Sequence, residues 1–515
     1  MTRRVMVLAT LVGCATDAET PVAADADWLV RASLDLRGVR PSLAELDRIA
    51  ADPTASDALL DDWLADMRFE LRVRDLFARV WRTRVDDFDQ GFFDSGFDLP
   101  DTAAFREAVG DEPLVVIGRV AALDLPYTEI VTSPVTWASA PLAKAFPVTY
   151  PEGATGWQEV VYTDGRQMAG VLSTNGTWWR YQSTPQNYNR GRANALSRIL
   201  LCSDFAARPV SFSRTEAATT ATGGAVDEAA VDRTATDPTC LSCHAGLDPL
   251  GSFLYGFRSF EGYSPSPTYA LEDERAWIGT TGVPPSYFGA PASDLRDLGV
   301  AIANDPRFVD CAVQTVYTGL YEVDVAAVDP ATLDRHRDAF LADGARLKAL
   351  YRSIVTDPAY AGAPRRLLPV ESLAAAVTDV TAYRWELDGL RTLGGGVDGR
   401  VVTRPASAPS PTTVLVQQRL AELAAPYAVL HDAERPAADQ LFAGLTFEED
   451  VDRDRAVFDA TLTRLVRRAL GRSPHAGELD GLRALWSDAE ALTDPQNAWA
   501  AVLTVLLRDP EFVLY

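Results

Sequence analysis

Residues 56–81 read SDALLDDWLADMRFELRVRDLFARVW, and apolar side chains recur in this stretch at about every third or fourth position. The apolar set is Leu59, Leu60, Trp63, Leu64, Met67, Leu71, Leu76, Phe77, Val80 and Trp81. Because an α-helix completes a turn in about 3.6 residues, this spacing gathers the set on one face and predicts helices that bury that face. The same periodicity extends over residues 27–90, which favours a mainly α-helical protein.

Two local signals mark helix starts. Ser42 and Glu45 have the spacing of a capping box, in which each side chain bonds to the backbone N–H of the other residue. An Asp-Pro pair with an aromatic residue two positions after the proline occurs at Asp305-Pro306-Arg307-Phe308, Asp357-Pro358-Ala359-Tyr360 and Asp509-Pro510-Glu511-Phe512. Asp suits the N-cap and Pro the first helical position, so these motifs predict helix starts and not a functional site.

The chain has 515 residues, of which 47% are hydrophobic and 23% charged, as is typical of a globular protein of about three domains. We expect an N-terminal helical domain over residues 27–150, a central domain over 151–400 and a C-terminal helical domain over 413–515. Residues 214–239, rich in Thr, Ala, Gly and Asp, predict a mobile loop, and the Pro/Ser-rich residues 401–412 predict a linker. The expected fold class is mainly α, a multi-domain helical protein with long irregular loops.

The net charge of the chain limits the classes of partner that it can bind. The 48 basic and 72 acidic residues give a formal net charge of −24, and Lys144 and Lys348 are the only lysines. Such a charge repels phosphate backbones, so we expect no nucleic-acid partner.

The first residues, MTRRVMVLATLVGC, indicate the compartment. Two arginines precede a short apolar run, as in a signal peptide, and Leu11-Val12-Gly13-Cys14 resembles the bacterial lipobox, whose cysteine is lipidated. We therefore expect residues 1–14 to be a lipoprotein signal peptide ending at Cys14. The expected location is the bacterial cell envelope, on the periplasmic face of the membrane or the outer-membrane surface, with the lipid as the membrane attachment. The alternatives are an ordinary secretory signal cut near Ala24 or Ala26, or a chance match.

Four cysteines remain after Cys14: Cys202, Cys240, Cys243 and Cys311. Four are too few for a disulfide-built scaffold of this size. They allow one CxxC unit and one long-range disulfide between Cys202 and Cys311 in an oxidising compartment. The alternative for that pair is two buried free thiols.

The chemistry of the sequence is concentrated at Cys240-Leu241-Ser242-Cys243-His244, the CxxCH pattern of c-type haem attachment. Cysteines one helical turn apart can each add to a haem vinyl group, and the adjacent histidine can then bind the iron. Asp237 suits the N-cap, Pro238 the first helical position, and Gly246 the end of the turn. The alternatives for the motif are a plain CxxC disulfide, a zinc site and a thioredoxin-like redox pair.

The second axial ligand of such an iron is less clear from the sequence. Met168 is the weak candidate, because it lies in a turn-rich stretch, although core packing explains a methionine there equally well. His336, His431 and His475 are alternatives, each expected to be a surface histidine on its helix. An open or water-bound position is also allowed.

Residues 240–263, CLSCHAGLDPLGSFLYGFRSFEGY, resemble the cytochrome-like segment of a family of large secreted proteins found in planctomycetes and myxobacteria. The matching residues are Cys240, Cys243, His244, Asp248, Pro249, Leu250, Gly251, Phe257 and Gly262. Residues 31–50, 166–202, 298–322 and 464–515 are similar to helical modules of that family, whose functions are unknown. The resemblance implies a small cytochrome-c-like haem segment, covalent haem c with its iron, and an envelope location.

Two functions follow from these patterns. The first is electron transfer, or support of a haem-dependent oxidoreductase, with an unidentified redox partner in the envelope. In this first function, Arg166 or Arg258 forms an ion pair with a haem propionate, and Asp248-Pro249 shapes a loop under the haem edge. The second is a surface lipoprotein without haem that binds or scaffolds, in which CxxC is a disulfide and residues 178–189 form an aromatic platform.

Overall fold

The computed structural model describes residues 26–84, 102–181, 189–205, 207, 238–257, 268–386, 390–398 and 401–515, and this part of the chain is mainly helical. The helices of the first half are α1 (Ala26–Arg37), α2 (Leu43–Ala51), α3 (Ser56–Ala65), α4 (Met67–Trp81), α5 (Thr102–Ala122), α6 (Glu129–Thr132), α7 (Ala140–Ala145), α8 (Asn175–Arg180), α9 (Arg190–Leu201) and α12 (Pro238–Ser252). Those of the second half are α13 (Leu271–Thr281), α14 (Leu295–Ala303), α15 (Pro306–Tyr321), α16 (Pro330–Ala342), α17 (Leu347–Val355), α18 (Pro358–Ala361), α19 (Val370–Thr381), α20 (Pro411–His431), α21 (Arg455–Leu470), α22 (Glu478–Glu490), α23 (Pro495–Arg508) and α24 (Pro510–Val513).

Short 3-10 helices and two small antiparallel sheets complete the described chain. The 3-10 helices are η1 (Pro53–Ala55), η3 (Gly170–Ser173), η5 (Tyr255–Phe257), η6 (Val325–Ala327) and η7 (Asp432–Glu434). The strands are β1 (Thr136–Ala138), β2 (Gln158–Val160), β3 (Ser286–Tyr287) and β4 (Ala290–Pro291). Strand β1 pairs with β2, with Thr136 opposite Val160, and β3 pairs with β4.

Most of the predicted helix starts are confirmed. The Ser42 and Glu45 side chains form both bonds of the capping box at the start of α2. Asp305, Asp357 and Asp509 each accept a hydrogen bond from the backbone two residues on and cap α15, α18 and α24.

The burial predicted for residues 56–81 was wrong at two positions, because Met67 is 86% exposed and Leu71 50% exposed. Met67 is the first residue of α4, and Leu71 lies off the buried face of that helix, whose buried apolar residues are Phe69, Val73, Leu76, Phe77, Ala78 and Trp81.

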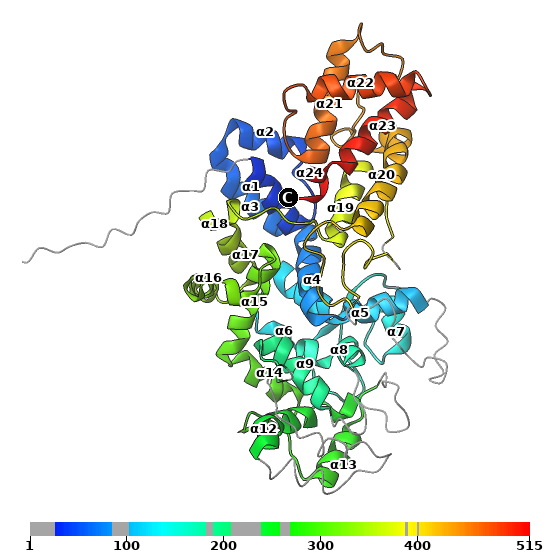
Figure 1. Cartoon of the computed structure of the whole chain (residues 1–515). Helices are drawn as coiled ribbons and strands as arrows, with labels where there is room; N and C mark the ends of the chain where they lie inside the picture. The colour runs from blue at the N-terminus through cyan, green and yellow to red at the C-terminus, as the bar shows by residue number, and fades with distance from the viewer. Residues whose placement is uncertain are drawn as a thin grey trace, which may run out of the picture.

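The interior of the described part of the chain is divided among three hydrophobic cores. The first takes side chains from Trp28 as far as Tyr360, and the second takes Leu34 together with residues between Leu367 and Tyr515. The third is small and gathers around Phe105, Phe146 and Trp179. Figure 1 shows α21 and α22 at one end of the molecule and α12 and α13 at the other. The predicted domain boundaries stay predictions, although the first core draws on both sides of residue 150.

Helix α1 lies where the first two cores meet, and it carries a buried carboxylate there. Asp35 is 1% exposed and accepts hydrogen bonds from the guanidinium of Arg366 and from the hydroxyls of Tyr360 and Tyr515. The backbone N–H of Arg366 also donates to the carbonyl oxygen of Tyr515 at 2.9 Å. One side chain of α1 thus holds together segments that are more than 300 positions away in the sequence.

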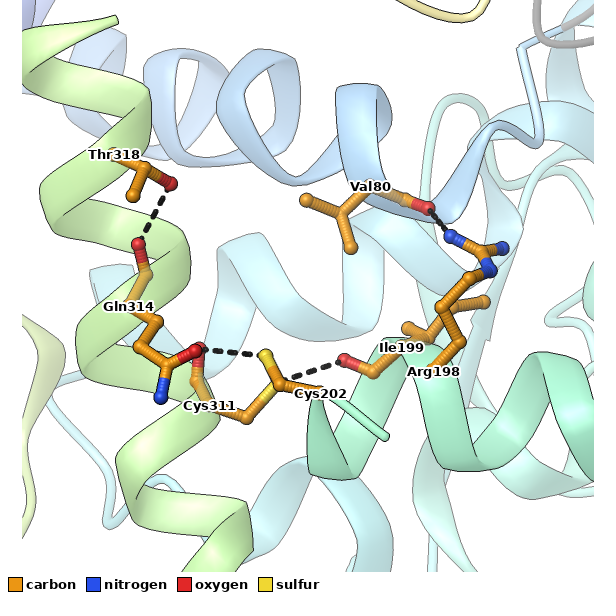
Figure 2. The surroundings of a disulfide bond; sticks show 7 residues. All are labelled: Val80, Arg198, Ile199, Cys202, Cys311, Gln314 and Thr318. Carbon is orange, nitrogen blue, oxygen red and sulfur yellow. Dashed lines mark hydrogen bonds between the residues drawn. A yellow bond between two sulfur atoms is a disulfide. The ribbon is translucent and has the colours of Figure 1, made fainter. Parts of the chain in front are cut away.

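A disulfide joins Cys202, directly after α9, to Cys311 of α15 (Figure 2). The two Cα atoms are 5.2 Å apart, and the residues are separated by 109 positions. Neighbouring contacts fix the end of α9: Arg198 donates to the carbonyl oxygen of Val80 at 3.2 Å. The structure therefore has the disulfide that the sequence allowed, and not the pair of free thiols.

Replacing Asp35 by Ala should strongly destabilise the protein. The change leaves Arg366 buried without its counter-charge, and breaking a buried ion pair in this way typically costs about 3–5 kcal/mol. The matched control is Asp47→Ala, because Asp47 is 67% exposed and its ion pair with Arg467 also joins the N-terminal and C-terminal helices. The control should lose less than about 1 kcal/mol. Urea denaturation measures both changes, and equal losses would contradict the role given to Asp35.

Removing the disulfide should also destabilise the folded state. The bond closes a loop of 109 positions, for which chain entropy predicts a stabilisation of about 4–5 kcal/mol, while measured losses are commonly about 2–5 kcal/mol. Urea denaturation with and without dithiothreitol measures the loss, and the Cys202→Ser/Cys311→Ser double variant should reproduce it without reductant. An unchanged free energy of unfolding in both experiments would show that the bond does not stabilise the protein.

Candidate functional site

Helix α12 carries the whole CLSCH motif and is longer than the sequence predicts. It begins at Pro238, which suits the first helical position, so the predicted mobile loop must end before that residue. Residues 214–237 of this loop, including Asp237, lie outside the described chain. The expectation that Gly246 ends the turn was wrong, because α12 runs through it to Ser252.

Burial explains why α12 continues past two poor helix formers. Pro249 lies inside the helix, where it removes one backbone hydrogen bond. Leu250 and Leu254, however, have no exposed surface and anchor this end of the segment in the first core. A side chain at Gly246 would stand 3.4 Å from the ring of Phe288, so that ring packs against the backbone of the helix. Asp248-Pro249 therefore belongs to the helix, and the loop expected there was wrong.

His244 is held by a carboxylate on the next turn of α12. Its Nδ1 atom lies 3.2 Å from each carboxylate oxygen of Asp248, four residues further on. Residues at this spacing are neighbours on one face of a helix. The His244 and Asp248 side chains are 23% and 20% exposed, so their contact is partly shielded from water.

Arg190, the first residue of α9, binds the same carboxylate. Its Nε donates to Oδ1 of Asp248 at 2.6 Å, and its second donor reaches Oδ2 at 3.0 Å, which is a two-point ion pair. Burial by itself raises the pKa of Asp248, but hydrogen bonds from His244 and Arg190 and the charge of Arg190 outweigh it and hold the pKa below its ordinary value. Asp248 is therefore an anion that faces the imidazole.

This arrangement fits a histidine that binds a metal. When Nδ1–H donates to a carboxylate, the other ring nitrogen, Nε2, keeps its lone pair for coordination. Cys243, the residue before His244, is half-buried and packs against the first core. The side chain of Cys240 lies outside the described part of the chain. The described residues of the motif thus meet the requirement that a c-type haem places on its histidine.

The structure places the other predicted ligands elsewhere. Met168 is buried in the third core, among Phe105, Phe146 and Trp179, which is the packing role that the sequence left open. Its ligation of iron stays a prediction. Among the alternatives, His475 is exposed, and His431 lies 3.2 Å from the carboxylate of Glu434.

His336 was expected at the surface, and that was wrong. The residue is 1% exposed, and its Nδ1 lies 2.8 Å from the hydroxyl of Ser353. Its Nε2 lies 3.5 Å from Asp357. Burial lowers the pKa of His336, although the Asp357 charge raises it in part. These contacts join α16 to the end of α17, which is a structural role.

Arg166 was a candidate partner for a haem propionate, but in the structure its side chain binds other residues of the protein. Its side chain has no exposed surface and forms a salt bridge with Asp164 at 2.6 Å. It also donates to the carbonyl oxygen of Ser173 and stands 3.6 Å from the ring centre of Tyr162. Arg166 therefore holds together the loops between β2 and α8. Arg258 lies outside the described residues.

The aromatic platform predicted for residues 178–189 is described only in part. Residues 182–188 lie outside the described chain. Trp178 and Trp179 are 1% and 3% exposed, so these two rings belong to the first and third cores and cannot form a platform at the surface.

Sequence reasoning missed the link between Arg190, Asp248 and His244. The spacing of four between His244 and Asp248 carried a signal, but the loop expected at Asp248-Pro249 hid it. Arg190 lies 58 positions before Asp248, and no local pattern connects them.

No group of three or more His, Cys, Asp and Glu side chains among the described residues is arranged to hold a metal ion. No helix among them is long and apolar enough to cross a bilayer.

Comparison of the chain with family models, with curated proteins and with solved structures found no match to any of them.

Proposed function

We propose that this protein is a c-type haem protein of the bacterial cell envelope, which transfers electrons or supports a haem-dependent oxidoreductase. Cys240 and Cys243 form the thioether bonds, and Nε2 of His244 binds the iron. The bound haem supplies a one-electron redox centre, while the chain supplies attachment, ligation and control of the potential. The observation that carries the proposal is the hydrogen bond from Nδ1 of His244 to Asp248, directly beside a CxxC motif on the same helix.

The disulfide supports the proposed compartment. Bonds such as Cys202–Cys311 persist in oxidising surroundings, outside the bacterial cytoplasm, where c-type haem is attached. The apolar start and the lipobox-like Leu11-Val12-Gly13-Cys14 agree with export and a lipid anchor. These residues lie outside the described chain, so this support comes from the sequence.

The position of α12 supports exchange of electrons with a partner. The helix lies at the end of the molecule opposite α21 and α22 (Figure 1). The His244 side chain retains 23% exposure, so the ligand stands near the surface and not in the middle of a core. A haem attached there is accessible to an envelope redox partner.

Haem attachment is tested with protein from a host that has the cytochrome c maturation machinery. We expect a c-type pyridine haemochrome spectrum that survives acid-acetone extraction, with one haem per chain. Cys240→Ala/Cys243→Ala should lose the covalent haem, because both thioether bonds are removed. The matched control Cys202→Ala/Cys311→Ala also removes two cysteines, and its haem content per folded chain should stay at the wild-type value.

Wild-type protein without haem from that host would overturn the proposal. The working function would then be the surface lipoprotein that binds or scaffolds, with Cys240 and Cys243 as a disulfide. Mass spectrometry of alkylated peptides identifies that disulfide directly.

Lipidation at Cys14 is tested separately. Labelling of the producing cells with a fatty acid should mark the wild-type protein, which should partition with membranes. Cys14→Ser should remove the label and release the protein, because a serine cannot form the thioether of the anchor. Equal labelling of the two proteins would contradict lipidation at this residue, without bearing on the haem.

A further inference from the structure

Two side chains stand in series behind the histidine of α12. The guanidinium of Arg190 contacts both carboxylate oxygens of Asp248, at 2.6 and 3.0 Å. The same two oxygens each lie 3.2 Å from Nδ1 of His244. A cation, an anion and an imidazole therefore follow one another, with Nε2 at the free end of the series.

We infer that Asp248 and Arg190 are positioning residues that set the reduction potential of the iron bound to His244, an inference that rests on the function proposed above. A carboxylate that accepts a hydrogen bond from Nδ1–H makes Nε2 of the imidazole a stronger electron-pair donor to a metal. A stronger donor stabilises ferric over ferrous iron. The positive charge of Arg190 pairs with the same carboxylate, so the carboxylate pulls less strongly on the Nδ1–H of His244 and the effect is smaller. The two residues thus act on the potential in opposite directions through one hydrogen bond.

The fold holds this series rigidly in place. Arg190 begins α9, and the neighbouring Asn189 donates from its side chain to the carbonyl oxygen of Gly251, near the end of α12, at 3.3 Å. The other end of α9 is followed by Cys202, whose disulfide to Cys311 ties it to α15. These contacts tie the start of α9 to α12 and its end to α15, so Arg190 is held beside Asp248.

The redox step is a simple one. A haem held by His244 would supply a one-electron centre, which an external reductant would reduce from the ferric to the ferrous form without forming or breaking a covalent bond. The proposed step is an electron transfer alone and includes no proton transfer by His244 or Asp248.

The test is a reductive titration with dithionite, followed by the haem spectrum, on haem-loaded full-length protein. Asp248→Asn keeps the shape of the side chain but removes its charge. It should shift the ferrous-to-ferric ratio at a fixed potential about tenfold towards ferrous, which is about 59 mV for one electron. Arg190→Gln removes the moderating cation and should shift the ratio towards ferric.

The matched control is Glu434→Gln. It breaks another histidine–carboxylate contact of 3.2 Å, with His431 at the end of α20, a helix that carries none of the residues that hold the haem in the proposed function. Its potential should equal that of the wild type. A role limited to folding would lower the stability of the Asp248 and Arg190 variants without moving their potentials in opposite directions.

Unchanged potentials, or shifts of both variants in the same direction, overturn the inference while covalent haem in the same samples leaves the proposed function standing. If Asp248→Asn does not mature, Arg190→Gln decides alone, and an unchanged or raised potential overturns the inference. Wild-type protein without haem overturns the proposed function and this inference with it.

Discussion

The buried carboxylate of Asp35 is the interaction on which the arrangement of the helices depends. It lies on α1, between the first core and the second, and accepts hydrogen bonds from Arg366, Tyr360 and Tyr515. An anion without exposed surface is stable only when its partners are in place, so these segments must assemble together. Leu34, the residue before Asp35, packs into the second core, while Leu36 packs into the first. Helix α1 is therefore shared between two cores and fixes one against the other.

At one end of the molecule, α12 is helical because of its surroundings and not because of its own sequence. Gly246 and Pro249 are poor helix formers, yet the burial of Leu250 and Leu254 holds the segment in place. Only in a continuous helix does Asp248 come back beneath His244. The contact that best supports metal binding is thus produced by packing at a distance from the ligand itself.

The sequence predicted a large part of the fold, because helical periodicity and capping are local. The capping box at Ser42, the Asp-Pro helix starts and the mainly α class follow from residues within one or two turns. Exposure was harder to predict, as Met67, Leu71 and His336 show, because a turn between helices or a neighbouring helix decides which face is covered. Met168 illustrates the same limit, since its place in an aromatic core depends on segments that meet only in the folded chain.

For the candidate site, the sequence by itself determined the CxxCH motif of Cys240, Cys243 and His244, because three residues at fixed local spacing are enough to define it. It also allowed, without deciding, the bond between Cys202 and Cys311. Tertiary structure alone decided that Arg166 is used internally, that Asp248 lies within a helix, and that Arg190 approaches it from 58 positions away. The physical reason is that the residues of the motif are neighbours in the sequence. The charges that surround them are brought together only when distant helices bury their apolar faces against one another.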